Sequence, residues 1–214
     1  MKGTLIKVIV IGGGGHAKVV ISILKKLSPF SILGYLDVAD KGKILGVKYF
    51  GNDSILKDIR KKNQRCAAVI GVGNVSLSHP RKDIYKRLKD LQFELPAIIS
   101  PQAIVNEDVR MGEGTVVMDG AVINSGTTIG QAAIINTHSS IDHDCVIGDF
   151  VHIAPGVVLS GGVKIGKNCL VSCGSQVIQS VTIGDNCLIG AGATVVENCI
   201  EPGVYLGTPA KRKV

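Results

Sequence analysis

The sequence contains no tryptophan, and only 4% of its 214 residues are aromatic, although 45% are hydrophobic. It also has no C-x-x-C pair and no apolar run of 18 residues. These absences argue against a zinc or redox site, a membrane-spanning helix and an aromatic nucleic-acid surface. No signal-peptide pattern precedes the first strand, so we expect a cytoplasmic protein that binds no metal, membrane or nucleic acid.

The apolar residues follow a strict period of six. From Ile99 to Val195, all seventeen positions counted in steps of six hold Ile, Leu, Val or Met. A second row, four residues after each of these, runs from Ala103 to Cys199 and holds only small or β-branched residues. So short a period indicates a repeat architecture. We predict a left-handed parallel β-helix with three sides per coil, between five and six coils, and both rows facing inward.

The corners of this β-helix need residues that allow a sharp turn. The residue after each inward aliphatic is often Gly, Asn, Asp or Ser, as at Gly112, Asn124 and Gly148. These residue types tolerate left-handed backbone, so we expect the tight turns at these positions. Four of the six cysteines fall in the small inward row, where we expect buried, unpaired thiols.

The first 94 residues show a different pattern, in which short apolar strands alternate with helical segments. We expect strands over 7–11, 32–36 and 67–72, and helices over 16–27, 53–62 and 81–91. This alternation predicts a small Rossmann-like α/β domain with a parallel sheet. Pro96 and Pro101 flank the passage into the β-helix. We therefore place one domain at residues 1–94 and the second at residues 95–214.

A glycine-rich loop joins the first strand to the first helix. Gly12-x-Gly14-x-x-Ala17 matches the dinucleotide fingerprint, which binds a phosphate at a helix N-terminus. Asp37 ends the second strand and suits a ribose hydroxyl or a base edge. A complete NAD fold needs two mononucleotide halves, and a domain of this length holds about one, so a mononucleotide diphosphate is the better ligand. The alternative interpretation of the glycines is a plain tight turn that binds no phosphate. His16 ends the glycine loop. Its imidazole either contacts a phosphate or the substrate, or makes its hydrogen bonds to the backbone of the loop.

Three histidines cluster between residues 138 and 152. His143 and His152 fall outside the inward row, so we expect both to project from the outer surface. His143 lies between Asp142 and Asp144, and a carboxylate bonded to an imidazole sets its tautomer and raises its basicity. This arrangement suits a general base that removes a proton from an amine or hydroxyl as it attacks an acyl group.

The hexapeptide series, the segment Gly-Gly-Gly-Gly-His-Ala-Lys-Val-Val at residues 12–20 and the segment Asp-His-Asp-Cys at residues 142–145 together resemble a known family. They are similar to the hexapeptide-repeat sugar acetyltransferases of the sialic acid O-acetyltransferase and bacillosamine-type N-acetyltransferase family. The resemblance covers nearly the whole chain. It implies a homotrimer, with acetyl-CoA along the β-helix between subunits and a nucleotide-linked amino sugar on the N-terminal domain.

The same resemblance implies roles for individual residues. His143 would be the general base and Asp144 its electrostatic partner. The family often has Glu at the position of Asp144. Whether Asp144 or Asp142 orients the imidazole of His143 stays open. The nucleotide sugar would contact Gly12, Gly14, His16, Asp37, Gly73 and Asn74. Acetyl-CoA would contact His152, Gly161, Cys173, Gly190, Pro209, Ala210 and Lys211.

The function expected from these residues is acetyl transfer from acetyl-CoA to the 4-amino group of a UDP-linked amino-deoxy sugar, for bacterial surface glycan synthesis. Asp37 is followed by Val38 where the family often has a second acid, so GDP and CMP stay open beside UDP. The alternative acceptor is a hydroxyl of sialic acid or another glycan sugar. The alternative of another class is a non-catalytic trimeric nucleotide-binding scaffold.

Overall fold

The computed structural model describes residues 5–74 and 80–213. These residues form two compact units: 5–73 with 80–101, and residue 74 with 102–213. No helix in the described ranges is both long enough and apolar enough to cross a membrane.

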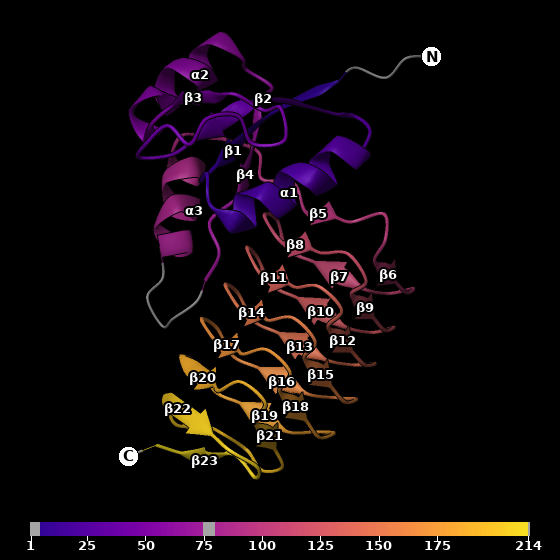
Figure 1. Ribbon diagram of the computed structural model, residues 1–214. Helices are drawn as coiled ribbons and strands as arrows, with labels where there is room; N and C mark the ends of the chain where they lie inside the picture. Colours follow the sequence, from indigo (N-terminus) through magenta and orange to yellow (C-terminus); the bar gives the residue numbers. More distant parts are fainter. Residues whose placement is uncertain (1–4, 75–79, 214) are drawn as a thin grey trace. The chain divides into compact units, whose positions relative to one another are not determined.

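The first unit is built on a four-stranded parallel sheet in the order β3-β2-β1-β4 (Figure 1). Its strands are β1 (Ile6–Ile11), β2 (Phe30–Leu36), β3 (Tyr49–Gly51) and β4 (Ala67–Ile70). Its helices are α1 (Gly15–Lys26), α2 (Leu56–Lys62), which follows the 3₁₀ turn η1 (Asp53–Ile55), and α3 (Pro80–Asp90). The three expected strands and three expected helices are confirmed with shifted ends. Strand β3 was not expected, because three residues are too short to show an apolar pattern.

The core of the first unit is formed by its central strands and by one face of each helix. Residues 8–11 of β1 are buried, as expected for a strand with neighbours on both sides and cover on both faces. Helix α1 buries Val20, Ile21 and Leu24 at helical spacing. Leu56 of α2 and Leu88 of α3 join the buried cluster beneath the sheet. The glycine loop after β1 therefore follows directly from the buried end of this strand.

The second unit is the predicted left-handed parallel β-helix, whose strands are nearly all two residues long (Figure 1). One face stacks β7 (Arg110–Met111), β10 (Thr128–Ile129), β13 (Val146–Ile147), β16 (Lys164–Ile165) and β19 (Thr182–Ile183). A second face stacks β6 (Ile104–Val105), β9 (Val122–Ile123), β12 (Ser140–Ile141), β15 (Val158–Leu159), β18 (Gln176–Val177) and β21 (Thr194–Val195). The third stacks β8 (Val116–Val117), β11 (Ile134–Ile135), β14 (His152–Ile153), β17 (Leu170–Val171), β20 (Cys187–Ile189) and β22 (Gly203–Leu206).

Two further short strands lie at the ends of this region of the chain. β23 (Lys211–Arg212) pairs antiparallel with β22 after the last coil, and β5 (Ile98–Ile99) precedes the first coil in sequence. Along the faces, each strand pairs in parallel with the strand one coil later, as Ile129 pairs with Ile147. One coil is therefore 18 residues, which is three times the period of six seen in the sequence. The last step, from β20 to β22, is 16 residues, because Ile189 pairs with Tyr205.

Both predicted inward rows are confirmed. From Val117 to Val195 every aliphatic position is at most 3% exposed, and the small row from Thr115 to Cys199 is at most 5% exposed. The first three aliphatic positions, Ile99, Val105 and Met111, are only partly buried. Four cysteines of the small row are buried and free, as expected: Cys145, Cys169, Cys187 and Cys199.

The expected position of the left-handed turns is wrong. Positive φ angles occur three residues after the inward aliphatic, as at Asp108 and Asp144, and not on the glycine that follows it directly. Those glycines are needed for close spacing: a Cβ on Gly148 would lie 2.7 Å from the carbonyl carbon of Gly166 in the next coil. Five coils repeat this glycine in one column, and a side chain there would collide with the neighbouring coil or tail: Gly112, Gly130, Gly148, Gly166 and Gly184.

Candidate active site

The polar residues expected at the catalytic centre lie along one edge of the β-helix. Five three-residue corners stack there, at residues 106–108, 124–126, 142–144, 160–162 and 178–180, and we call this column the site edge. Backbone hydrogen bonds fix its register, because the amide of Asp144 donates to Ser125 O (3.1 Å) and that of Gly162 donates to His143 O (2.9 Å). Each side chain of the site edge therefore has a defined neighbour one coil below and one coil above.

His143 and Asp144 form a hydrogen-bonded pair at the middle corner. Nδ1 of the imidazole lies 2.8 Å from Oδ2 of the carboxylate, and the two side chains are 63% and 72% exposed. Asp144 has a left-handed backbone with φ of 58°. Asp is one of the few non-glycine residues enriched in this conformation, so its residue type suits this position of the corner.

Asp142 supports the same corner in a different way. Its Oδ1 accepts hydrogen bonds from the backbone amide of His143 (2.8 Å) and from Nδ2 of Asn124 (2.9 Å). Asn124 in turn accepts a bond from Nδ2 of Asn106 one coil below (2.6 Å). The sequence did not point to these two asparagines as site residues, although their 18-residue spacing ahead of Asp142 was the available signal. The three side chains form an amide ladder that leads to the carboxylate.

These contacts set the charges of the corner. The amide of His143 and then the side chain of Asn124 lower the pKa of Asp142 below its ordinary value. The hydrogen bond from Asp144 and then the charge of Asp142 raise the pKa of His143 above its ordinary value. Asp144 therefore contacts the ring, whereas Asp142 contacts the backbone and acts on the ring through its charge. The imidazole is a stronger base than a free histidine and keeps Nε2 for a further partner.

A hollow of about 630 Å³ opens beside this pair. It is lined by Asp142, His143, Asp144, Ser160, Gly161, Gly162, Gln179 and Ser180. Gly161, which the resemblance placed at the coenzyme, is thus next to the expected base. Within the described residues, no His, Cys, Asp and Glu side chains are grouped in threes in a way that could hold a metal ion. The lining of this hollow carries polar and acid–base groups.

His152 lies in the outward row of β14 as expected, but it is only 7% exposed. Its Nδ1 lies 2.5 Å from the carbonyl oxygen of Asn74, which can only accept, so the ring hydrogen is on Nδ1. Its Nε2 then accepts from Nδ2 of Asn136 at 3.0 Å. Asn74 was expected to contact the sugar and His152 to contact the coenzyme. In the structure the two residues are hydrogen-bonded to each other, and His152 is also hydrogen-bonded to Asn136.

The remaining residues of the expected coenzyme site lie in the last coils and the tail, and none of them lines the hollow at His143. Cys173 is exposed, and its carbonyl accepts a bond from the amide of Gly192. Of the other four, Gly190 directly follows β20, Pro209 and Ala210 lie in the tail loop, and Lys211 lies on β23. Gly190 N donates to Tyr205 O, Ala210 N follows Pro209 and donates to Thr194 O, and Lys211 Nζ pairs with Glu197 at 3.3 Å.

In the first unit, the residues expected at the nucleotide meet at the carboxyl end of the sheet. Gly12 has φ of 110°, and a Cβ there would lie 2.9 Å from Val72 Cγ2, so both the backbone and the packing require glycine. Asp37 accepts a 2.6 Å hydrogen bond from the amide of Gly13, which ties the second strand to the glycine loop. Gly14 caps α1. A Cβ on Gly73 would lie 3.6 Å from the ring of His16.

A hollow of about 390 Å³ lies over this glycine loop and contains three lysines that were not expected from the sequence. It is lined by Gly13, Gly14, Gly15, Lys18, Lys41, Lys43, Ile44 and Leu45. The loop with two of the lysines is held by buried Tyr35, whose hydroxyl accepts from Lys41 N (2.9 Å) and donates to Gly42 O (2.8 Å). Three positive charges and a helix N-terminus around one hollow favour a phosphate group.

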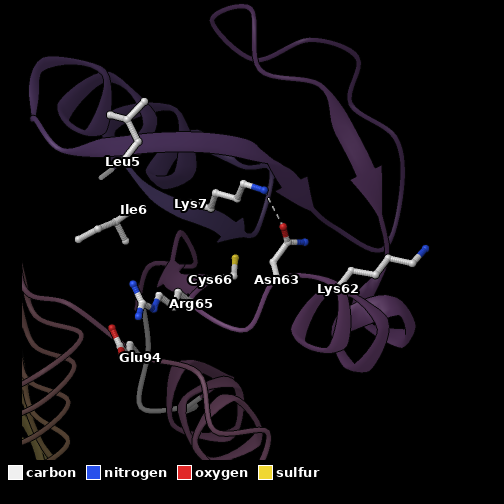
Figure 2. Close-up of a pocket in the computed structure, with 8 residues that line it drawn as sticks. All are labelled: Leu5, Ile6, Lys7, Lys62, Asn63, Arg65, Cys66 and Glu94. Atoms are coloured by element: carbon white, nitrogen blue, oxygen red, sulfur yellow. Dashed lines mark hydrogen bonds between the residues drawn. The ribbon is translucent and has the colours of Figure 1, made fainter. Parts of the chain in front are cut away.

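Another hollow, of about 460 Å³, lies at the amino end of the same sheet (Figure 2). Lys7 reaches across it to Asn63 (2.9 Å), and Lys62, Arg65 and Glu94 also line it. It contains none of the residues expected at a site. Ligands of open α/β sheets bind at the carboxyl ends of the strands, so the glycine-loop hollow is the stronger nucleotide site.

Comparisons with known proteins find two families in separate parts of this chain. Residues 7–88 match the PglD N-terminal domain family, and residues 126–161 and 162–197 match the bacterial transferase hexapeptide family of six repeats. A curated relative, the UDP-N-acetylbacillosamine N-acetyltransferase of Bacillus subtilis, is 34% identical over 52% of this chain and 50% of that protein. The aligned part therefore spans about half the length of that relative.

Two solved structures are similar over almost their full length. PerB from Caulobacter crescentus, in complex with CoA and GDP-perosamine, is 36% identical over 99% of both chains, with a TM-score of 0.90. The acetyltransferase domain of PglB from Neisseria gonorrhoeae, in complex with acetyl coenzyme A, is 33% identical with a TM-score of 0.91. That match covers 98% of this chain and 100% of the other.

The effect of Asp144 on the pKa of His143 can be measured in the protein without any substrate. Asp144→Asn removes the carboxylate whose hydrogen bond is the largest cause of the raised His143 pKa. We expect the midpoint of the His143 imidazole, followed by NMR as a function of pH, to move to lower pH in this variant. Asp149→Asn, which breaks the distant ion pair of Asp149 with Lys167, is the matched control and should leave the midpoint in place. Equal midpoints in all three proteins would show that Asp144 does not control the ring.

Proposed function

The chain belongs to the hexapeptide-repeat sugar acetyltransferases of the sialic acid O-acetyltransferase and bacillosamine-type N-acetyltransferase family, and we propose that it acetylates the 4-amino group of a nucleotide-linked amino-deoxy sugar with acetyl-CoA. The observation that carries the proposal is the combination of two sites in one chain. The first unit has a lysine-lined hollow over a nucleotide-type glycine loop, and the β-helix has an imidazole made basic by a carboxylate. Synthesis of a bacterial surface glycan is the setting that we propose for this reaction.

In the proposed reaction, His143 is the general base. The sugar nitrogen attacks the thioester carbonyl carbon of acetyl-CoA, and a C–N bond forms. His143 Nε2 takes the proton of that nitrogen, the C–S bond breaks, and the thiolate of CoA leaves and takes up the proton. Asp144 holds the hydrogen on Nδ1, so that Nε2 is the atom with a free lone pair. Asp142 adds a second negative charge that stabilises the imidazolium formed in this step.

For the nucleotide, we propose that Gly12, Gly14 and His16 contact the phosphates at the N-terminus of α1, with Asp37 and Gly73 shaping the loop and Asn74 contributing to the sugar site. Lys18, Lys41 and Lys43 join this set because they line the hollow over the same loop. The relatives include one named for a UDP sugar and one bound to GDP-perosamine, so UDP and GDP are the first nucleotides to compare.

For the coenzyme, we propose that Gly161 contacts the acetyl end, near His143. Cys173, Gly190, Pro209, Ala210 and Lys211 would meet the rest of the molecule towards the tail. His152 would act from its buried group with Asn136, by shaping the wall of the site. The free buried cysteines fit a reducing compartment, which supports the proposed cytoplasmic location.

Release of free CoA thiol from acetyl-CoA tests the proposed reaction. We expect release that depends on a UDP- or GDP-linked 4-amino-4,6-dideoxy sugar, and a loss of about 100-fold or more in kcat for His143→Ala, because general-base catalysis contributes about that much. Lys164→Ala, an outward substitution on β16, is the control. Release that is equal with and without the amino sugar, or that persists in His143→Ala, would contradict the proposal. Release with a hydroxyl acceptor instead would establish O-acetylation.

The lysine-lined hollow gives a separate prediction for substrate binding. Lys41→Ala combined with Lys43→Ala should raise the KM of the nucleotide sugar about tenfold or more, because hydrogen bonds to charged groups contribute about 1.5–3 kcal/mol. The KM of acetyl-CoA should stay unchanged. Lys57→Ala on α2, which is exposed and outside the hollow, controls for the loss of charge. An unchanged KM for the nucleotide sugar in the double variant would place the phosphates elsewhere.

We also propose that the active form is a homotrimer. Val146, Val158, Ile178 and Val196 are between 37% and 45% exposed on the surface of the β-helix, and the pair His143–Asp144 is open to solvent in a single chain. Contact with a second chain would cover these apolar side chains, since large exposed apolar patches are rare on monomers. It would also shield the reaction at His143 from water. Sedimentation equilibrium should give a particle of three chains, and a monomer at assay concentrations would overturn this part of the proposal.

A further inference from the structure

The backbone does not explain why residue 161 is a glycine. Gly161 is the central residue of its corner, and it has no left-handed φ. The equivalent positions in the neighbouring corners of the site edge hold Ser125, His143 and Gln179, all with side chains. The turn at this position is therefore made equally well by residues with a Cβ.

The three atoms nearest to a side chain built at residue 161 all belong to the imidazole of His143. A Cβ built on Gly161 would lie 2.6 Å from Nε2, 2.7 Å from Cε1 and 3.3 Å from Cδ2 of this ring. Real Cβ atoms do not approach so closely, so the ring would have to move. This differs from Gly148, where a Cβ would meet the backbone of the next coil. The histidine, and not the fold, accounts for this glycine.

The carboxylate of the pair has a similar opening on its other side. A Cβ on Gly126, one coil below, would lie 2.6 Å from Oδ1 of Asp144. Gly126 has a positive φ, but so do Asp108, Asp144 and Ser180 at the same corner position, so the left-handed turn alone does not require glycine. The imidazole of His143 and the carboxylate of Asp144 thus lie between two coils, and both coils have a glycine at the position that faces the pair, Gly126 below and Gly161 above.

We propose that Gly161 is a positioning residue, whose missing side chain lets the imidazole of His143 lie against its backbone with Nδ1 on Asp144 and Nε2 beside the hollow. A side chain at this position would push the ring away from Asp144 towards solvent, because the ring is exposed and free to turn. The consequence for catalysis rests on the proposed function. The geometric part concerns the free protein and needs no substrate.

The neighbours of the ring make its ionisation a clean measure of its position. Among the residues that line the hollow, the only other titratable groups are Asp142 and Asp144. The corner below contributes Asn124, Ser125 and Gly126, and the corners above contribute Ser160, Gly161, Gly162, Gln179 and Ser180, none of which carries a charge. A shift in the midpoint of the imidazole therefore reports its distance from these two carboxylates.

The test compares Gly161→Ala with Ser125→Ala, a substitution at the same corner position one coil below His143. By NMR titration of the free protein, we expect the midpoint of His143 to fall towards its ordinary value in Gly161→Ala and to stay in place in Ser125→Ala. We also expect kcat to fall about 100-fold in Gly161→Ala, as a displacement of about 1 Å typically causes. An unchanged midpoint in Gly161→Ala would overturn the proposal.

A double variant covers the case in which Gly161→Ala does not fold. In Gly161→Ala with His143→Ala, the new Cβ meets no imidazole, so its thermal stability should equal that of His143→Ala alone. If the double variant also fails to fold, the backbone requires the glycine and the proposal is wrong. If the midpoint shifts as expected but no acetyl transfer is found with the unaltered protein, the positioning of the ring stands and the proposed function fails.

Discussion

The 18-residue register between coils is the constraint on which the rest of the β-helix depends. Parallel strands stack about 4.8 Å apart, so each residue lies directly over the residue one coil earlier. This rule places the aliphatic rows in the core and the glycine column at one corner. It also places the three-residue corners of the site edge above one another. A side chain in such a column has little choice of neighbour, and its neighbours can be inferred from the sequence once the register is known.

The candidate catalytic pair shows how this regular scaffold holds an irregular site. His143 and Asp144 are adjacent in the chain, and the left-handed corner brings their side chains together without a folded pocket around them. The amide ladder from Asn106 through Asn124 to Asp142 uses the coil spacing to fix the second carboxylate. The arrangement leaves the base exposed in one chain, which is why the proposed function includes contact with further chains.

Much of the architecture was predictable because it follows from simple periods. The six-residue rows predicted the β-helix, and the alternation of strands and helices predicted the sheet of the first unit. The position of the left-handed turns was wrong, because glycine serves two purposes here. It allows positive φ at some corners, and at Gly148 it allows close approach of coils. Composition alone does not separate these two causes.

The parts of the site that escaped prediction depend on contacts between distant residues. Lys41 and Lys43 line the glycine-loop hollow from a loop whose backbone is hydrogen-bonded to buried Tyr35. The buried ring of His152 has its Nδ1 partner in the carbonyl of Asn74, which is 78 residues away in sequence. The expected pairing of His143 with a carboxylate did not need such contacts, since both residues share one corner. The pairing of neighbouring residues such as His143 and Asp144 could therefore be predicted from the sequence. The contacts between residues distant in sequence that complete the sites could not.

The pH dependence of kcat/KM, measured for the unaltered protein and for Asp144→Asn beside the NMR titration of His143, tests the central claim that His143 is the base. The pH profile of kcat/KM reports ionisations of the free enzyme and the free substrates. A part of the profile that comes from ionisation of the amine acceptor would be the same for the unaltered protein and for Asp144→Asn. We expect the acid limb to coincide with the midpoint of His143 and to move with it to lower pH in the variant. An acid limb that stays fixed while the midpoint of the imidazole moves would place the essential base elsewhere.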